Sequence, residues 1–232
     1  QFIQRKLMPA VNALGGKRFL FYRMLPVHEL GGDYLDILTN KNGSVGLTIA
    51  DAMGKGMPGA FLMLMARTIF RLIAKENIPP HRVLTALNSH FCREIAEMQA
   101  FVTQFYCIYN PSNRILVYAN AGHNPPVLLR RSGGKPETLS GNGIALGGKE
   151  DAAYRSYSAQ LAGGDIVVIY SDGLSDARND NGQQFGLAGI AKTIMKYKEY
   201  SADGICDGLI NAVMNHCHSQ TDDISLMVLK AE

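Results

Sequence analysis

Hydrophobic and polar positions follow two different patterns along this chain of 232 residues. Apolar residues recur every three or four positions in four segments, and this period of about 3.6 residues predicts helices. The predicted helices are 58–75, 81–98, 187–198 and 202–218. Other runs are rich in β-branched and aromatic residues and are bounded by Gly, Pro, Asn or Ser, which predicts strands. The predicted strands are 18–24, 44–50, 101–109, 115–119, 127–130, 166–170 and 224–229.

The order of these elements predicts the fold class. Helices come in pairs between runs of strands, whereas a doubly wound parallel sheet alternates strand and helix throughout. We therefore expect an α+β fold, a layered α-β-β-α sandwich of two antiparallel sheets flanked by helix pairs. No linker-like composition interrupts 11–232, which predicts one domain. The apolar side of 1–8 indicates a helix, and we interpret 1–10 as the end of a connecting helix from an upstream region.

Charge and composition exclude several kinds of partner. The chain holds 23 Lys and Arg against 20 Asp and Glu, so its net charge of +3 disfavours nucleic acid. Its longest apolar run, 60–66, is stopped by Arg67, far short of the roughly 20 residues that cross a bilayer. Four cysteines without a C-x-x-C pair favour reduced thiols and a cytoplasmic location. They are Cys92, Cys107, Cys206 and Cys217.

Acidic residues stand at four places where a strand-like run meets a glycine-rich or turn-like segment. They are Asp33, Asp51, Asp172 and the pair Asp222-Asp223. Carboxylates at converging strand ends provide the hard oxygen ligands that Mg²⁺ and Mn²⁺ prefer. For the dipeptide Asp172-Gly173 taken alone, an ordinary turn is the competing interpretation. The four positions together favour a metal site.

A glycine-rich segment in the same region imitates a nucleotide-binding motif. Residues 54–59 satisfy G-x-G-x-x-G between a strand and a helix. A dinucleotide fold also needs a second parallel strand ending in an acidic residue, and Pro79-Pro80 removes the backbone donors that such a strand requires. The context therefore disfavours dinucleotide binding.

The histidines allow more than one interpretation. His216 and His218 flank Cys217, but neighbours two apart on a helix point to different faces, which favours a solvated helix end over a metal site. His123 follows a predicted strand in a Gly/Pro-rich loop. It is compatible with a catalytic acid or with a histidine that holds the loop backbone by hydrogen bonds.

Five motifs, in order, resemble one enzyme family: Leu30-Gly31-Gly32-Asp33-Tyr34-Leu35-Asp36, Ile49-Ala50-Asp51-Ala52-Met53-Gly54-Lys55-Gly56-Met57-Pro58-Gly59-Ala60, Asn120-Ala121-Gly122-His123-Asn124-Pro125-Pro126, Tyr170-Ser171-Asp172-Gly173-Leu174-Ser175-Asp176-Ala177 and Thr221-Asp222-Asp223-Ile224-Ser225. The chain resembles the SpoIIE/RsbU-type bacterial branch of the PPM (PP2C-like) serine/threonine phosphatases. The match spans nearly the whole chain, and the fold of that family agrees with the order of elements above.

The resemblance implies a catalytic centre with two Mn²⁺ or Mg²⁺ ions and an activated water. It implies that Asp51 bridges the ions, that Asp33 and the carbonyl of Ala52 complete one site, and that Asp172 and Asp222 hold the other. Whether Asp222 or Asp223 is the ligand stays open. An arginine that clamps phosphate is not evident. Arg18, Arg23 and Lys55 are candidates, with surface solvation as the competing interpretation.

The resemblance also implies a function. It predicts a metal-dependent serine/threonine protein phosphatase whose substrate is a phosphorylated regulatory protein, an anti-sigma-factor antagonist in a partner-switching pathway. It further implies an upstream sensory or receiver domain, and leaves open a homodimer. The alternative is a non-catalytic PP2C-like domain that binds a partner as an adaptor.

Overall fold

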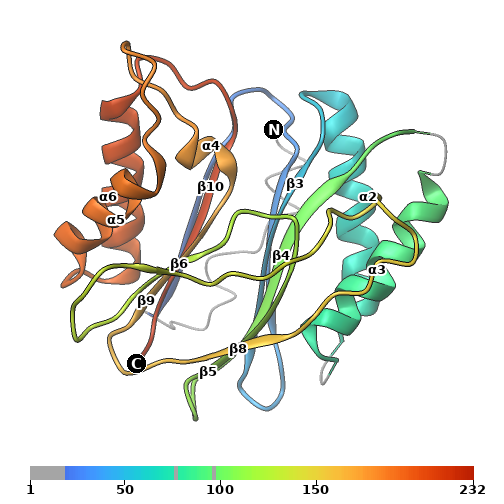
Figure 1. Ribbon diagram of the computed structural model, residues 1–232, viewed down its shortest axis with the longest axis horizontal. Helices are drawn as coiled ribbons and strands as arrows, with labels where there is room; N and C mark the ends of the chain where they lie inside the picture. The colour runs from blue at the N-terminus through green and yellow to red at the C-terminus, as the bar shows by residue number, and fades with distance from the viewer. Residues whose placement is uncertain (1–18, 76–77, 96–97) are drawn as a thin grey trace. The chain divides into compact units, whose positions relative to one another are not determined.

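The computed structural model describes residues 19–75, 78–95 and 98–232, and their helices and strands are labelled in Figure 1. The predicted opening helix at 1–8, and with it the connecting segment 1–10, lies outside the described residues. Clustering of contacts divides the chain into two compact units. The described part of the first unit is 29–125 and 140–160, and that of the second is 19–28, 126–139 and 161–232.

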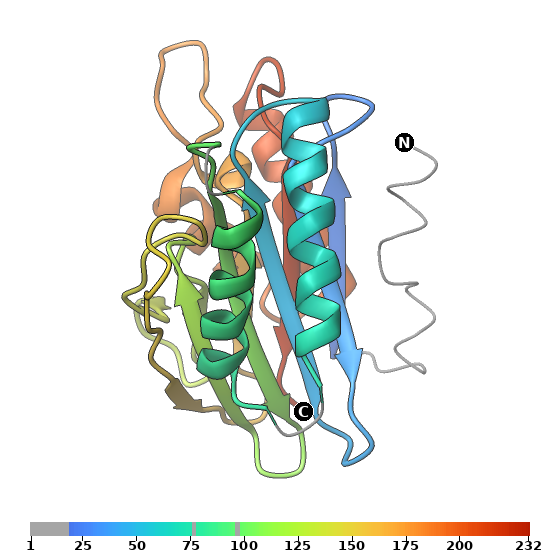
Figure 2. The same cartoon turned by 90° about the vertical axis from the view of Figure 1, so that its right-hand side faces the viewer.

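The first unit holds an antiparallel sheet of five strands in the order β2-β3-β4-β5-β8. The strands are β2 (Asp33–Thr39), β3 (Val45–Ala52), β4 (Val102–Asn110), β5 (Ile115–Ala121) and β8 (Tyr157–Gln160). Helices α2 (Met57–Ile73) and α3 (Pro80–Glu94) lie side by side over one face of this sheet (Figure 2).

Apolar stripes on the two helices hold the first unit together. Each helix begins with proline in its first turn, where the missing N–H costs no hydrogen bond. Phe70 of α2 is fully buried and meets the ring of Tyr106 on β4 edge to face, with ring centroids 5.0 Å apart. Leu84 and Phe91 of α3 are buried in the same cluster. The side chains of Tyr34 and Ala50 belong to it too, so the even-numbered residues of β2 and β3 face the helices.

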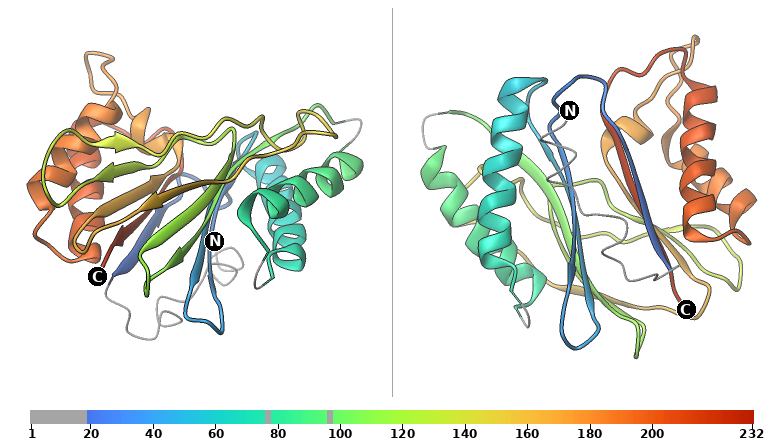
Figure 3. Two further views of the ribbon diagram at one scale, coloured as in Figure 1. Left: turned by 60° about the horizontal axis from the view of Figure 1, so that its bottom comes forward. Right: turned by 180° about the vertical axis from the view of Figure 1, so that it is seen from behind.

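The second unit holds an antiparallel sheet in the order β1-β10-β9-β6-β7. The strands are β1 (Leu20–Leu25), β6 (Val127–Leu129), β7 (Glu137–Thr138), β9 (Ile166–Tyr170) and β10 (Ile224–Lys230). Its helices are α4 (Asp172–Ser175), α5 (Gly186–Tyr197) and α6 (Ala202–His216). The first described strand, β1, pairs with the last, β10, and Figure 3 shows the two ribbons side by side.

Helices α5 and α6 pack their apolar residues against this sheet. Ile190 and Ile194 of α5, together with Ile205 and Leu209 of α6, are fully buried in one cluster with residues of β9 and β10. Gly208 of α6 lies against the ring of Tyr197, where an added Cβ would come within 2.7 Å of a ring carbon. A glycine is therefore needed there for the two helices to approach closely.

The observed elements match most of the predicted ones. All four predicted helices and all seven predicted strands are present, and β9 has the predicted bounds. α3 ends at Glu94 and α6 at His216, earlier than predicted, and Cys217 after α6 is already extended. The strand β2 was not predicted, because its acidic Asp33 and Asp36 are buried, which the sequence pattern alone disfavours. In the described part of the chain, none of the helices has the length and hydropathy that a membrane span requires.

Candidate metal-binding edges and neighbouring residues

Asp33 and Asp51 stand directly opposite each other on neighbouring strands of the first unit. The register of β2 and β3 pairs these two residues, so their Cα atoms are about 5 Å apart and their side chains share one face of the sheet. Odd-numbered positions of both strands project from the face opposite to α2 and α3. Asp33 is buried at 2% exposure, whereas Asp51 is partly exposed. The carbonyl of Ala52 follows Asp51 at the end of β3.

Glycine allows the backbone to approach this edge closely. A Cβ on Gly32 would lie 2.6 Å from the carbonyl oxygen of Ala52 and 3.3 Å from Oδ1 of Asp51. The backbone N–H of Ala52 also donates to the carbonyl of Gly32 at 3.2 Å. An alanine at position 32 would therefore displace the two oxygen ligands that the sequence predicts there.

The turn that leads into α2 lies against the same glycine. Gly54 and Gly56 have φ of 96° and 68°, a left-handed region that glycine enters without strain. Gly59 lies in the first turn of α2. A Cβ added to Gly59 would be 3.5 Å from the Cα of Gly32. The start of α2 is thus packed directly on the residue that precedes Asp33.

The second unit brings Asp172 together with the segment 222–223. Asp172 is the first residue of α4, and a Cβ on Gly173 would lie 2.1 Å from the carbonyl oxygen of Asp223. Ser171 links the two segments further, since its N–H donates to the carbonyl of Ser225 at 2.9 Å and its hydroxyl accepts the N–H of Ser225 at 3.0 Å. Asp172 therefore opens a short helix rather than a turn.

Asp222 and Asp223 have different surroundings. The carboxylate of Asp223 is 7% exposed and accepts the backbone N–H of Val27 at 2.8 Å. Asp222 is exposed, and its Oδ1 accepts the N–H of Asp223 at 2.9 Å. Asp223 therefore holds the segment that follows β1, and the exposed carboxylate of Asp222 is the better candidate ligand.

Each unit thus brings two of the predicted aspartates into neighbouring segments, Asp33 and Asp51 in the first unit and Asp172 and Asp222 in the second. Among the described residues, no group of three or more His, Cys, Asp or Glu side chains is gathered closely enough to hold a metal ion. The three basic residues considered as phosphate-binding candidates have different surroundings. Arg18 lies outside the described residues, Arg23 pairs with Asp207 at 2.7 Å and Lys55 is exposed in the turn before α2. The ion pair of Arg23 supports its interpretation as an ordinary surface residue.

An ion pair with a buried carboxylate fastens α2 to β2. Asp36 has a fully buried side chain and receives two hydrogen bonds from Arg71 of α2, Nε to Oδ2 at 2.6 Å and Nη2 to Oδ1 at 2.7 Å. The hydroxyl of Tyr34 and the N–H of Ile37 donate to the same carboxylate. The pKa of Tyr34 is raised well above its usual value by burial and then by the charge of Asp36. This pair was not predicted from the sequence, because its partners are 35 residues apart.

His123 is buried at 6% exposure, and one nitrogen of its ring bonds a side chain. Its Nδ1 lies 2.8 Å from the hydroxyl of Thr103 on β4. Asn120 holds the loop backbone, since its side-chain amide donates to the carbonyl of His123 at 2.8 Å and accepts the N–H of His123 at 2.7 Å. Thr103 was not identified from the sequence, because only the register of the sheet shows its place opposite Asp51.

The buried thiols and the residues around Cys217 were also considered as possible metal ligands. Burial raises the pKa of the Cys107 and Cys206 thiols well above the usual range, so these thiols stay protonated. His216 bonds the carbonyl of Gln183 through Nε2 at 2.9 Å, Cys217 is buried and His218 is exposed. The side chains of His216, Cys217 and His218 therefore have separate surroundings. The sequence had favoured a solvated helix end here over a metal site.

A comparison with known families decides where the chain belongs. The family described as Stage II sporulation protein E (SpoIIE) matches residues 41–232. The chain belongs to the SpoIIE family. The resemblance seen in its motifs is thereby confirmed.

Relatives of this SpoIIE-family chain include named phosphatases. It is 29% identical over 207 residues to the phosphoserine phosphatase RsbU of Bacillus subtilis, an alignment that covers 89% of this chain and 61% of RsbU. The chain therefore spans less than two thirds of the length of that relative.

Solved structures confirm the predicted fold class. The SiaA-PP2C domain of Pseudomonas aeruginosa superposes with a TM-score of 0.87 at 21% identity, covering 100% of this chain and 94% of that one. RsbX in complex with magnesium superposes with a TM-score of 0.67 at 16% identity, covering 90% and 92%. At these identities the likeness shows the PP2C-like fold alone.

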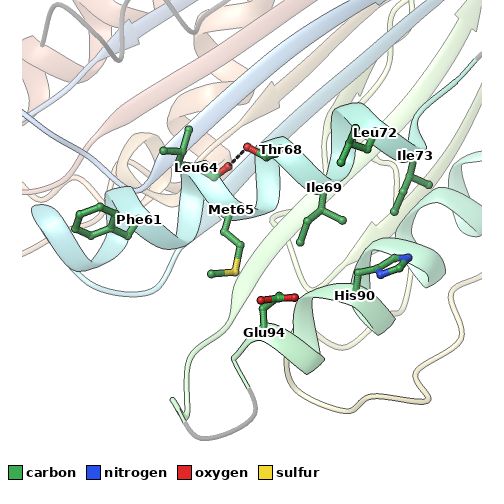
Figure 4. A pocket seen from close by; sticks show the side chains of 9 residues that line it. All are labelled: Phe61, Leu64, Met65, Thr68, Ile69, Leu72, Ile73, His90 and Glu94. Atoms are coloured by element: carbon green, nitrogen blue, oxygen red, sulfur yellow. Dashed lines mark hydrogen bonds between the residues drawn. The ribbon is translucent and has the colours of Figure 1, made fainter.

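An apolar groove also lies between α2 and α3 of this SpoIIE-family chain (Figure 4). Its volume is about 450 Å³, and Phe61 and Leu72 beside it are about two-thirds exposed. Met65 reaches into it, whereas Met63 is buried in the core and Met53 and Met57 are exposed. The groove includes none of the predicted ligands, so it is a separate surface.

Proposed function

We propose that this chain is a divalent-metal-dependent phosphatase of phosphoserine and phosphothreonine in proteins. The observation that carries the proposal is the direct pairing of Asp33 with Asp51, beside a backbone carbonyl that only a glycine at position 32 leaves room for. Membership in the SpoIIE family and the likeness to the phosphoserine phosphatase RsbU support it.

The residues fit the metal ions that this family implies. Carboxylates and a carbonyl are hard oxygen donors, which suit Mn²⁺ and Mg²⁺ and do not suit softer metals. In the proposal Asp33, Asp51 and the carbonyl of Ala52 would hold one ion, and Asp172 and Asp222 would hold the other. The family resemblance implies that Asp51 would serve both ions. The exposed carboxylate of Asp222 favours it over Asp223, which is engaged with Val27.

Two such ions, when bound, supply an activated water and offset negative charge on the phosphoryl oxygens. The protein's own part is to position them. The close approach at Gly32 sets the distance between the carbonyl of Ala52 and the two aspartates, and the contact of Gly173 with the backbone of Asp223 fixes Asp172 beside the segment 222–223. These backbone contacts hold the carboxylates before any ligand arrives, which lowers the cost of assembling the site.

The proposed substrate is a phosphorylated regulatory protein of a partner-switching pathway, by analogy with RsbU. The chain spans 61% of RsbU, so an upstream regulatory domain is part of the proposal as well. No observation on the described residues favours the adaptor function, which needs no metal.

Phosphate release from a phosphoserine peptide and from p-nitrophenyl phosphate tests the proposal, with Mn²⁺, with Mg²⁺ and with chelator. We expect chelator-sensitive turnover that Asp172→Asn abolishes. The matched control is Asp151→Asn, an aspartate that is 78% exposed and pairs with Lys149 at the surface, which should retain full activity.

Thermal unfolding with Mn²⁺ provides an independent reading. An ion that binds only the folded protein at 100 times its dissociation constant stabilises it by about 2.7 kcal/mol. We expect that stabilisation in the wild type and its loss in Asp172→Asn. Absence of both turnover and Mn²⁺ stabilisation in the wild type would contradict the proposal and favour the adaptor function.

A further inference from the structure

A second groove lies between α5 and α6 of the second unit and includes none of the predicted metal ligands. Its volume is about 460 Å³, within the roughly 300–1,000 Å³ of ordinary ligand-binding sites. Lys192 and Lys196 of α5 line one side, and Asn211 and Asn215 of α6 line the other. Residues four apart on a helix lie one turn apart on the same face, about 6 Å from each other. The groove thus has a cationic wall and an amide wall.

Aromatic rings that lie against glycines form the apolar lining between these walls. An added Cβ on Gly189 would come within 2.6 Å of the ring of Phe185, and one on Gly208 within 2.7 Å of the ring of Tyr197. Phe185 is buried, and Tyr197 and Ala212 are partly buried. A larger residue at either glycine would push a ring outward into the groove. The floor is therefore apolar, and its depth depends on the two glycines.

The charges that line this groove have one sign. Among the described residues that line it, none is acidic, whereas Lys192 and Lys196 are both exposed. The ammonium of Lys196 lies 5.2 Å from the centre of the Tyr197 ring, within the range of a cation–π contact. Asp207 of α6 lies on another side of the helix, where it pairs with Arg23 of β1 at 2.7 Å. Charge complementarity therefore favours an acidic occupant.

The asparagines indicate which kind of acidic molecule fits. Within the part of the chain that the structure describes, the side-chain amides of Asn211 and Asn215 have no hydrogen-bonding partner. Each amide offers two donors and one acceptor. An extended peptide has unpaired backbone N–H and C=O groups that need such partners, whereas a helix pairs most of its own. The amide wall therefore fits an extended segment better than a helix.

An extended segment also matches the spacing of the lysines. Alternate side chains of an extended chain point to the same side, about 7 Å apart, which is close to the separation of Lys192 and Lys196 along α5. Apolar side chains at every second position face the rings of the floor, and acidic side chains between them face outward. The long apolar stem of lysine lets both ammonium groups reach the outward carboxylates.

We propose that the groove between α5 and α6 binds an extended segment of a partner protein in which acidic and apolar residues alternate. In the complex Lys192 and Lys196 pair with the carboxylates, and Asn211 and Asn215 bond the backbone of the segment. The groove contains none of the predicted metal ligands, so this inference does not depend on the proposed phosphatase activity.

Binding of two labelled peptides, measured by fluorescence anisotropy, tests the proposal. One short peptide alternates Glu with Val, and the other has Gln in place of every Glu. We expect the Glu peptide to bind at least about 10-fold more tightly at low salt, and we expect this advantage to shrink above about 0.5 M salt, where exposed charges are screened. Equal binding of the two peptides, or no binding of the Glu peptide, would overturn the proposal.

Charge reversal in the groove provides the matched comparison. Lys192→Glu combined with Lys196→Glu should weaken binding of the Glu peptide by more than about 10-fold, because two attractions become two repulsions. The control combines Lys41→Glu with Lys135→Glu, which changes the net charge equally at two exposed lysines outside the groove. It should leave the affinity within a few-fold, and the unfolding midpoint checks that both double variants fold. An equal loss in the control would mean that overall charge drives binding, and the proposal would be wrong.

The amide wall and the peptide nature of the occupant have separate tests. Asn211→Ala combined with Asn215→Ala should weaken the Glu peptide several-fold and leave its salt dependence unchanged, since no charge is lost. Unchanged affinity in this variant would contradict the extended arrangement. Single-stranded oligothymidine supplies negative charge without a peptide backbone and should compete poorly. If it displaced the Glu peptide at a lower concentration than unlabelled Glu peptide does, the groove would be a site for nucleic acid and the proposal would fail.

Discussion

Replacing Arg71 by Met should lower the free energy of unfolding by about 3 kcal/mol. The guanidinium of Arg71 donates two hydrogen bonds to the fully buried carboxylate of Asp36. Methionine keeps much of the apolar stem but removes both donors and the positive charge. Tyr34 and the N–H of Ile37 continue to donate to Asp36. The buried carboxylate is then left without its counterion.

The magnitude follows from how deep each partner lies. Removing one member of a buried ion pair costs about 3–5 kcal/mol, because the other charge stays uncompensated. The side chain of Arg71 is 42% exposed, so water can partly replace it, which places the loss at the lower end of that range. Asp36→Asn added to Arg71→Met should recover part of the loss, because no buried charge remains.

Equilibrium unfolding in urea measures the effect, as a shift of the midpoint at an unchanged slope. The control is Arg93→Met, whose ion pair with Glu150 spans 3.5 Å between side chains that are both 64% exposed. That pair should contribute less than about 1 kcal/mol. If Arg71→Met were no more destabilising than Arg93→Met, the reasoning from burial would be wrong.

Two further predictions concern the other unit and the glycine at the metal edge. Burial alone would raise the pKa of Asp165, but two backbone N–H groups and Arg130 outweigh it and hold the pKa below its usual value. The stability that Asp165 contributes is then present above about pH 4 and is lost as the pH falls through the lower pKa of the folded state. The difference in the free energy of unfolding between wild type and Asp165→Asn, measured in urea, should therefore shrink below about pH 4. Gly32→Ala places a Cβ 2.6 Å from the carbonyl oxygen of Ala52 and should abolish the thermal stabilisation by Mn²⁺; a full stabilisation in this variant would refute the role of that close approach.

Local features of the chain were predictable because their causes are local. The period of apolar residues located all four predicted helices, and the apolar run at 166–170 located β9 with its observed bounds. Asp33, Asp51 and Asp172 were identified from their place between apolar runs and glycines. Their assignment as ligands of two ions stays a prediction.

Features that join distant parts of the chain were not predictable in the same way. β2 was missed because Asp36 breaks its apolar pattern. The buried carboxylate is compensated there in part by Arg71, which is 35 residues away in the sequence. The helix ends after Glu94 and His216 were also missed, since the chain leaves each helix where tertiary packing directs it.

The sequence by itself determined the type and approximate extent of most elements and the acidic positions of interest, since propensity, periodicity and turn chemistry act over a few residues. Only the tertiary structure decided which strands pair and which side chains become neighbours. It joined β1 to β10 across the length of the described chain, set Asp33 opposite Asp51, and brought Thr103 between Asp51 and His123. Such pairings depend on register, and a shift of one residue would turn every side chain of a strand to the other face.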